Sequence, residues 1–79
     1  MRRYFFDIHD GYEVIDQTGR KCSSFEAAKS EAMSIASGHA SDPKMLNTDG
    51  GAIIVVIRDG PGNEVCTIRL VFSIDTARP

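Results

Sequence analysis

The opening stretch RYFFDIHDGYEV, residues 3–14, places the imidazole of His9 beside the carboxyl group of Asp10. A carboxylate next to a histidine can fix the tautomer of the ring and raise its pKa, as a general base requires. Neighbouring residues of a strand point to opposite faces, however, and Asp10-Gly11 is typical of a tight hairpin turn. No nucleophile accompanies the pair. We therefore interpret Asp10 as a turn residue and predict no catalytic residues and no enzymatic activity.

The two cysteines, Cys22 and Cys66, supply the only thiols of the chain. Cys22 directly precedes an expected helix start, where the helix dipole can lower the pKa of a thiol, but a small apolar packing residue is the simpler interpretation. Neither cysteine has the spacing of a zinc site, so we predict no metal and no cofactor. No apolar signal segment follows the first arginines, which favours reduced thiols and a cytoplasmic protein.

Four basic residues form the clearest cluster of positive charge if the first hairpin brings them together: Arg2, Arg3, Arg20 and Lys21. Such a cluster can bind a phosphate or an acidic peptide, and it can equally be a solvated rim. The whole chain has 9 basic and 11 acidic residues and a net charge of −2. This balance disfavours nucleic-acid binding, which requires the neutralisation of many phosphates.

The elements that position these residues can be predicted from hydrophobic patterning. Alternation predicts a strand over residues 3–9, a turn at Asp10-Gly11 and a return strand over Tyr12–Ile15. A strand with apolar residues on both faces is expected at Ala52–Ile57, and alternation resumes over Glu64–Phe72. The apolar run at residues 52–57 is too short to cross a membrane.

A single helix is expected between these two pairs of strands. Ser23 and Glu26 have the spacing of a capping box, and apolar residues then recur at helical spacing. The helix could end at Gly38, but we favour an end near Ser41, because the residue before Pro43 avoids the helical conformation.

These elements predict one α+β domain over residues 1–79, with a flexible tail at residues 73–79. The expected order is β-β-α-β-β, an antiparallel four-stranded sheet with one helix packed on one face. A loop rich in turn formers, residues 43–51, joins the helix to the third strand.

One helix covers one face of a sheet, so apolar side chains on the opposite face need another cover. Tyr4, Phe6 and Ile8 are expected to face the helix. The candidate interface on the other face consists of Phe5, Ile54, Val56, Val65 and Val71, with the parity of residues 53–57 left open. Leaving such side chains in water forfeits about 1.5 to 3 kcal/mol each. We therefore expect a homodimer, formed face to face or edge to edge through the third strand, unless polar neighbours shield the patch.

Four motifs occur in order along the chain: RYFFDIHDG at residues 3–11, D..G at 16–19, EAA..EA at 26–32 and V.I.DG.G..V at 55–65. With them the chain resembles an uncharacterised family of small alphaproteobacterial proteins, abundant in rhizobia, which implies no activity and no site residues. Through Gly11-Tyr12 and Glu31-Ala32 it is also similar in architecture to the N-terminal domains of HicB-type antitoxins. That resemblance implies association with further copies and with a small protein.

The sequence therefore predicts a non-enzymatic, self-associating protein-interaction module, a homodimer with room for a further protein partner. The alternative is a small anion-binding or ligand-binding protein that uses the basic cluster near the first hairpin.

Overall fold

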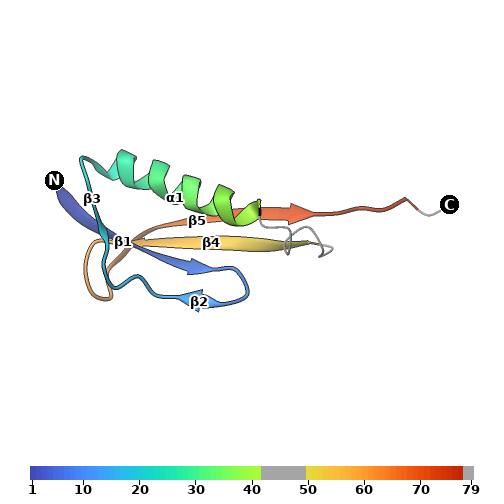
Figure 1. Cartoon of the computed structure of the whole chain (residues 1–79), viewed down its shortest axis with the longest axis horizontal. Coiled ribbons are helices and arrows are strands. Elements are labelled where there is room, and N and C mark those ends of the chain that lie inside the picture. Colours follow the sequence, from blue (N-terminus) through green and yellow to red (C-terminus); the bar gives the residue numbers. More distant parts are fainter. Residues whose placement is uncertain (42–49, 78–79) are drawn as a thin grey trace.

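The computed structural model describes residues 1–41 and 50–77 and shows an α+β fold, with one helix on one face of an antiparallel sheet (Figure 1). The elements are β1 Arg2–His9, β2 Glu13–Val14, β3 Arg20–Cys22, α1 Phe25–Ala40, β4 Gly50–Arg58 and β5 Glu64–Ser73. The sheet has five strands, so the predicted count of four was wrong. The additional strand is β3, and the return strand β2 is shorter than expected.

The strand order is β2-β1-β4-β5, and β3 pairs with the beginning of β1 while β2 pairs with its end. All pairings are antiparallel. The apolar strand β4 therefore lies in the interior of the sheet, between β1 and β5. Both edges of β4 are paired over Ile54–Arg58, so the predicted edge-to-edge pairing through this strand is blocked there, and the long strand at the edge is β5.

The core lies between α1 and the face of the sheet that carries Tyr4 and Phe6, as expected from strand parity. In β4 the side chains of Ile53, Val55 and Ile57 are fully buried, so this parity faces the helix. The helix presents small residues to the sheet, Ala28, Ala32 and Ala36. Small side chains let the helix axis lie close to the strands, which produces a thin core.

The helix begins one residue later than the capping box predicted. Ser24, not Ser23, is the N-cap, and its hydroxyl accepts a 3.1 Å hydrogen bond from the backbone N–H of Ala27. The helix continues through Gly38 and ends at Ala40, close to the expected end. His39 therefore belongs to the last helical turn.

At one end the sheet narrows to a two-stranded ribbon of β4 and β5. β1 pairs with β4 only from Ile54 onward, whereas β5 continues to pair as far as Gly50 (Figure 1). Leu70 on β5 is consequently 37% exposed there. Ser73 still belongs to β5, so the predicted tail begins after it. The expected loop lies outside the described residues except for Gly50 and Gly51, which belong to β4.

The opposite face of the sheet is less apolar than predicted. Of the candidate interface residues, Val56 is only 9% exposed, and Phe5 and Ile54 are half-buried. Val65 and Val71 are 38% and 70% exposed. The solvent-exposed part of the predicted interface therefore lies on the edge strand β5. In the described ranges, α1 is not long and apolar enough to span a membrane.

Candidate functional site

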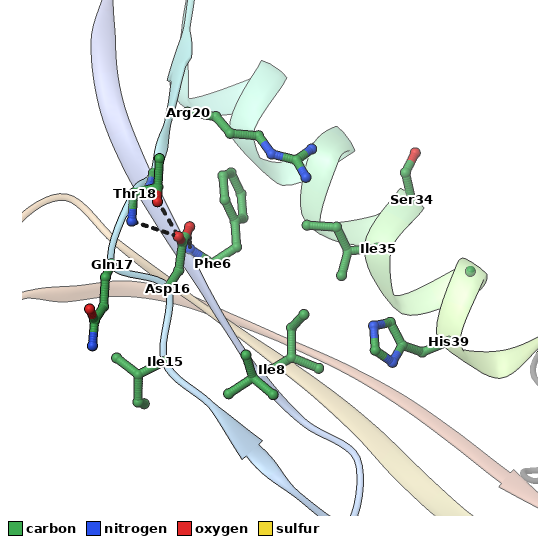
Figure 2. A pocket seen from close by; sticks show the side chains of 13 residues that line it. Phe6, Ile8, Ile15, Asp16, Gln17, Thr18, Arg20, Ser34, Ile35 and His39 are labelled. Atoms are coloured by element: carbon green, nitrogen blue, oxygen red, sulfur yellow. Dashed lines mark hydrogen bonds between the residues drawn. The ribbon is translucent and has the colours of Figure 1, made fainter.

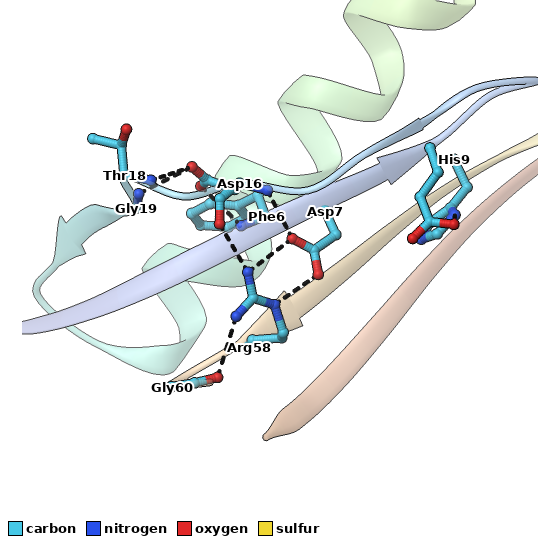
Figure 3. A network of polar contacts seen from close by, with 9 residues as sticks. Phe6, Asp7, His9, Asp16, Thr18, Gly19, Arg58 and Gly60 are labelled. Carbon is cyan, nitrogen blue, oxygen red and sulfur yellow. Dashed lines mark hydrogen bonds and ion pairs between the residues drawn. The ribbon is translucent and has the colours of Figure 1, made fainter. Parts of the chain in front are cut away.

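The edge of the sheet beside β1 is interrupted between β2 and β3, and the side chain of Asp16 fills the interruption (Figure 3). One carboxylate oxygen accepts a hydrogen bond from the backbone N–H of Phe6, at 3.1 Å. The other accepts from the backbone N–H groups of Thr18 and Gly19, at 3.0 Å each. The carboxylate thus replaces the strand that would otherwise pair with this part of β1.

Gly19 is required where the chain returns to β1. Its φ is +73°, and an added Cβ would lie 2.9 Å from the Tyr4 carbonyl oxygen and from a ring atom of Phe5. Both the left-handed conformation and the close approach exclude a side chain here.

On the opposite face of the sheet from α1, Asp7 and Arg58 form a two-point ion pair (Figure 3). Arg58 donates from Nε to Oδ2 of Asp7 at 2.7 Å and from Nη2 to Oδ1 at 3.0 Å. The guanidinium also donates to the carbonyl oxygens of Asp16, at 2.8 Å, and Gly60, at 3.3 Å. Its carbon lies 5.0 Å from the centre of the Phe5 ring.

Arg58 therefore covers Phe5, which the sequence analysis had left exposed on this face. The carboxylate of Asp7 also accepts a 2.9 Å bond from the backbone N–H of Asp16. The network joins β1, β4 and the connection between β2 and β3. Because its oxygens and N–H groups are engaged with one another, we interpret it as structural.

Both carboxyl groups of this network have lowered pKa values. The hydrogen bond from Arg58 is the main reason for the lowered pKa of Asp7, and it outweighs the effect of burial. Burial alone would raise the pKa of Asp16, but the hydrogen bonds from Gly19, Phe6 and Thr18 together outweigh it and lower the pKa. The same ion pair raises the pKa of Arg58 above its ordinary value.

A groove of about 700 Å³ runs between α1 and the edge formed by β2, β3 and their connection (Figure 2). Its apolar lining consists of Phe6, Ile8, Val14, Ile15 and Ile35. Its polar and small lining residues are Asp16, Gln17, Thr18, Gly19, Arg20, Ser34, Gly38 and His39. An apolar groove of this size with a few polar groups has the general character of a ligand site.

His39 lies at one end of the groove, and its Nδ1 is 2.5 Å from Oδ2 of Asp10 at the hairpin tip. The histidine–aspartate pair of this protein is therefore Asp10 with His39, two residues far apart in sequence. The adjacent pair separates as predicted: His9 lies 4.0 Å from Glu13 across the hairpin. His39 itself is one of the residues that line the groove.

The four basic residues occupy adjacent positions on β1 and β3 but belong to two faces. Arg3 is opposite Lys21, whereas Arg2 and Arg20 follow the alternate parity. Arg20 forms an ion pair with Glu31 of α1, Arg2 lies 3.8 Å from Asp59, and Arg3 donates to the carbonyl oxygen of Thr18 at 2.9 Å. Of the four, Arg20 is the one that lines the groove.

Both cysteines are free thiols. Cys22 is buried in the core at the end of β3, and Cys66 is half-buried and packs against the core. Burial of Cys22 among apolar side chains agrees with its interpretation as a packing residue. Within residues 1–41 and 50–77, no group of three or more potential metal ligands occurs.

The comparisons with known proteins identify a family. A model described as a domain of unknown function, DUF6894, matches residues 3–71. The chain belongs to the DUF6894 family. No curated protein and no solved structure match the chain. The family assignment agrees with the predicted membership of an uncharacterised family, and DUF6894 carries no assigned activity that could be transferred to these residues.

Sequence reasoning missed three features of this DUF6894 chain: the ion pair of Asp7 with Arg58, the network role of Asp16, and the pair of Asp10 with His39. Asp7 did provide a signal, because a charged residue inside an apolar strand is rarely buried without a partner. Arg58 at the end of the adjacent apolar strand was the available cation. The pair of Asp10 and His39 depends on how the hairpin meets the helix, which no local pattern indicates.

Proposed function

We propose that this DUF6894 chain is a non-enzymatic protein-interaction module that associates with a second copy of itself along the outer edge of β5. The observation that carries the proposal is the position of β5, a strand of 10 residues at the end of the sheet. It pairs with β4 on one side, and no strand of the described residues pairs with it on the other. Its unpaired N–H and C=O groups form a template for another strand.

The edge of β5 has few of the features that block strand addition. Proteins protect such edges with short strands, charges, proline or bulges. β5 contains no proline, Arg69 is the one charged residue after Glu64, and the register irregularity lies near its beginning, opposite Ile57 and Arg58. Exposed apolar side chains at Val65 and Val71 accompany the open edge.

The sequence of β5 also favours one register for pairing with itself. Consider two antiparallel copies of β5 that are related by a two-fold axis normal to the sheet. The residue on the axis then faces its own copy, and residues at equal distances before and after it face each other. With Ile68 on the axis, Val65 faces Val71 of the second copy, and Thr67 faces Arg69. With Arg69 on the axis, the two Arg69 side chains would face each other directly, which is destabilising. We therefore assign Ile68 to the axis.

This register extends each sheet into the next and keeps both helices on the same face. It pairs the two most exposed members of the predicted interface: Val71, on the opposite face, and Val65, which the register irregularity leaves without a partner on β4. Phe5, Ile54 and Val56 lie on that face as well, further from the axis. The architectural resemblance to HicB-type antitoxin domains, which associate with copies of themselves, supports the same proposal. The two free cysteines support a reducing, cytoplasmic location.

The test is the molar mass in solution of the wild-type chain and of two lysine variants, measured by light scattering after size exclusion. Wild type is expected at twice the chain mass of 8.6 kDa. Val71→Lys places a charge opposite Val65 of the second copy and is expected to weaken association at least about tenfold. Met33→Lys is the matched control, because Met33 is 57% exposed on the helix, and it should remain dimeric. A monomeric wild type at high micromolar concentration, or equal masses for both variants, would contradict the proposal.

A further inference from the structure

We propose that the groove between α1 and the β2–β3 edge is a binding site for a small amphipathic anion, a carboxylate with an aliphatic or aromatic body. Such a ligand would lie with its body against Ile8, Ile15 and Ile35 and its carboxylate at Arg20 (Figure 2). No residue of β5 lines the groove, so this site is separate from the proposed dimer edge.

The first argument is Gly38, a glycine inside the last turns of α1 that lines the groove. Glycine within a helix is about 1 kcal/mol less favourable than alanine. Its φ is not positive, and an added Cβ would meet nothing within 4 Å, so neither backbone conformation nor packing in the described residues requires it. The absent side chain keeps this wall of the groove open for an occupant.

The second argument is the charge of the lining. Three lining side chains can carry charge: Asp16, Arg20 and His39. The oxygens of Asp16 are taken by the backbone N–H groups of Phe6, Thr18 and Gly19, so this carboxylate has little capacity left for a cation. Of the remaining two, Arg20 is a cation with several N–H donors, whereas Nδ1 of His39 is already paired with Asp10. The lining therefore favours a negatively charged ligand.

Arg20 has donors to spare for such a ligand. Its ion pair with Glu31 uses Nη1, and its side chain is 59% exposed. A guanidinium has five N–H donors and binds carboxylates through two parallel hydrogen bonds. Glu31 does not line the groove, so a ligand carboxylate can approach Arg20 from the groove side.

The length of the groove indicates the size of the apolar body. Glu31, which holds Arg20, and His39 are eight positions apart on α1, which corresponds to about 12 Å along the helix axis. Between these two ends the helix contributes Ile35 and the floor is formed by Phe6 and Ile8. A medium-length aliphatic chain or a small aromatic system fits this span, with the second polar end at His39.

Decanoate is a suitable probe, with decanol as the neutral analogue of the same chain length. Both are titrated below their aggregation concentrations into the isotopically labelled protein, and backbone amide shifts are recorded. Decanoate is expected to bind saturably and to shift the amides of Ile35, Gly38 and Thr18. Decanol should bind at least about tenfold more weakly, because it lacks the charge that Arg20 recognises. Equal binding of both compounds would overturn the assignment of an anion site.

Two variants locate the ligand. Gly38→Leu fills the open wall of the groove and is expected to reduce the affinity for decanoate at least about tenfold. Ser37→Leu is the control, because it adds the same side chain at an exposed neighbour outside the lining, and it should leave the affinity for decanoate unchanged. Arg20→Gln should bring the affinity for decanoate close to that for decanol. Unchanged affinity in Gly38→Leu and Arg20→Gln would overturn the proposal, and it would do so whatever the oligomeric state.

Discussion

At the scale of single residues, two carboxylates decide how this small sheet is held together. Asp16 replaces missing strand hydrogen bonds at the β2–β3 interruption, and Asp7 neutralises Arg58 on the face that the helix does not cover. What the sequence could not show is that the two residues meet, with the Asp7 carboxylate accepting a hydrogen bond from the backbone N–H of Asp16.

Replacement of Asp16 by alanine should destabilise the chain by about 2 to 4 kcal/mol. The variant leaves the half-buried N–H of Phe6 without its acceptor and releases the turn at Thr18 and Gly19. Urea denaturation provides the free energy of unfolding. Asp75→Ala is the matched control, because Asp75 is exposed beyond β5, and it should change stability by less than about 0.5 kcal/mol. Equal effects of the two substitutions would contradict the role of Asp16.

Separating Asp7 and Arg58 should be more damaging than removing both. Arg58→Met leaves Asp7 buried without its cation and should cost about 3 to 5 kcal/mol. The double variant with Asp7→Leu should regain part of that loss, since no charge stays unpaired. If the loss of stability in the double variant equals the sum of the losses in the two single variants, Asp7 and Arg58 are not energetically coupled.

The lowered pKa values of Asp7 and Asp16 set the direction of the pH dependence. A carboxyl group whose pKa is lower in the folded chain binds its proton more readily in the unfolded chain. The stability that it contributes is therefore present above the unfolded pKa of about 3.9 and is lost as the pH falls through the folded pKa. Wild type should lose thermal stability steeply below about pH 4. Asp7→Asn, which has one such group fewer, should show a shallower loss, and parallel curves would contradict this account.

At the scale of elements, the long periodic segments could be predicted and the short ones could not. Residues 25–40 and the alternating strands carry enough apolar positions for their period to be recognised. β3 has three residues, Arg20–Cys22, and no recognisable period, so the sequence indicates no strand there. Two consecutive serines left the helix cap ambiguous by one position. The groove required the meeting of α1 with β2, which is tertiary information.

The N-cap offers a test at this scale. Ser24→Ala removes the acceptor for the N–H of Ala27 and should lower the free energy of unfolding by about 1 kcal/mol. Ser23→Ala should have an effect below about 0.5 kcal/mol, because the Ser23 side chain does not cap the helix. Thermal denaturation of both variants measures the difference in stability between them. A larger loss of stability in Ser23→Ala than in Ser24→Ala would show that Ser23 caps the helix, as the sequence predicted.

At the scale of the whole molecule, the chain is elongated, with extents of 55 × 21 × 18 Å, and its longest strand lies at an edge. The sequence predicted more apolar strand surface than one helix can cover. It placed that surface across the whole second face, because it could not show that Arg58 covers Phe5. On β5 the exposed large apolar residues are Val65, Leu70 and Val71.

The proposed register predicts opposite effects of two charges at one position. Thr67 faces Arg69 of the second copy, so Thr67→Glu should form two symmetric ion pairs and tighten the dimer several-fold, at about 0.2 to 1 kcal/mol for each pair. Thr67→Arg should weaken it by a similar factor. Sedimentation velocity over a range of concentrations measures both, with thermal stability as the control for folding. Equal dissociation constants would contradict the register with Ile68 on the axis.

Amide hydrogen exchange tests edge pairing of β5 most directly. Exchange rates are measured for every amide at protein concentrations below and above that of dimer formation. Alternate amides of Glu64–Ser73 point away from β4. We expect these amides to exchange quickly in the dilute protein and to become protected in the concentrated protein. The exchange rates of the amides of α1 should not change with concentration. Outward amides of β5 that exchange equally fast at all concentrations would contradict edge pairing, even for a dimer formed through another surface.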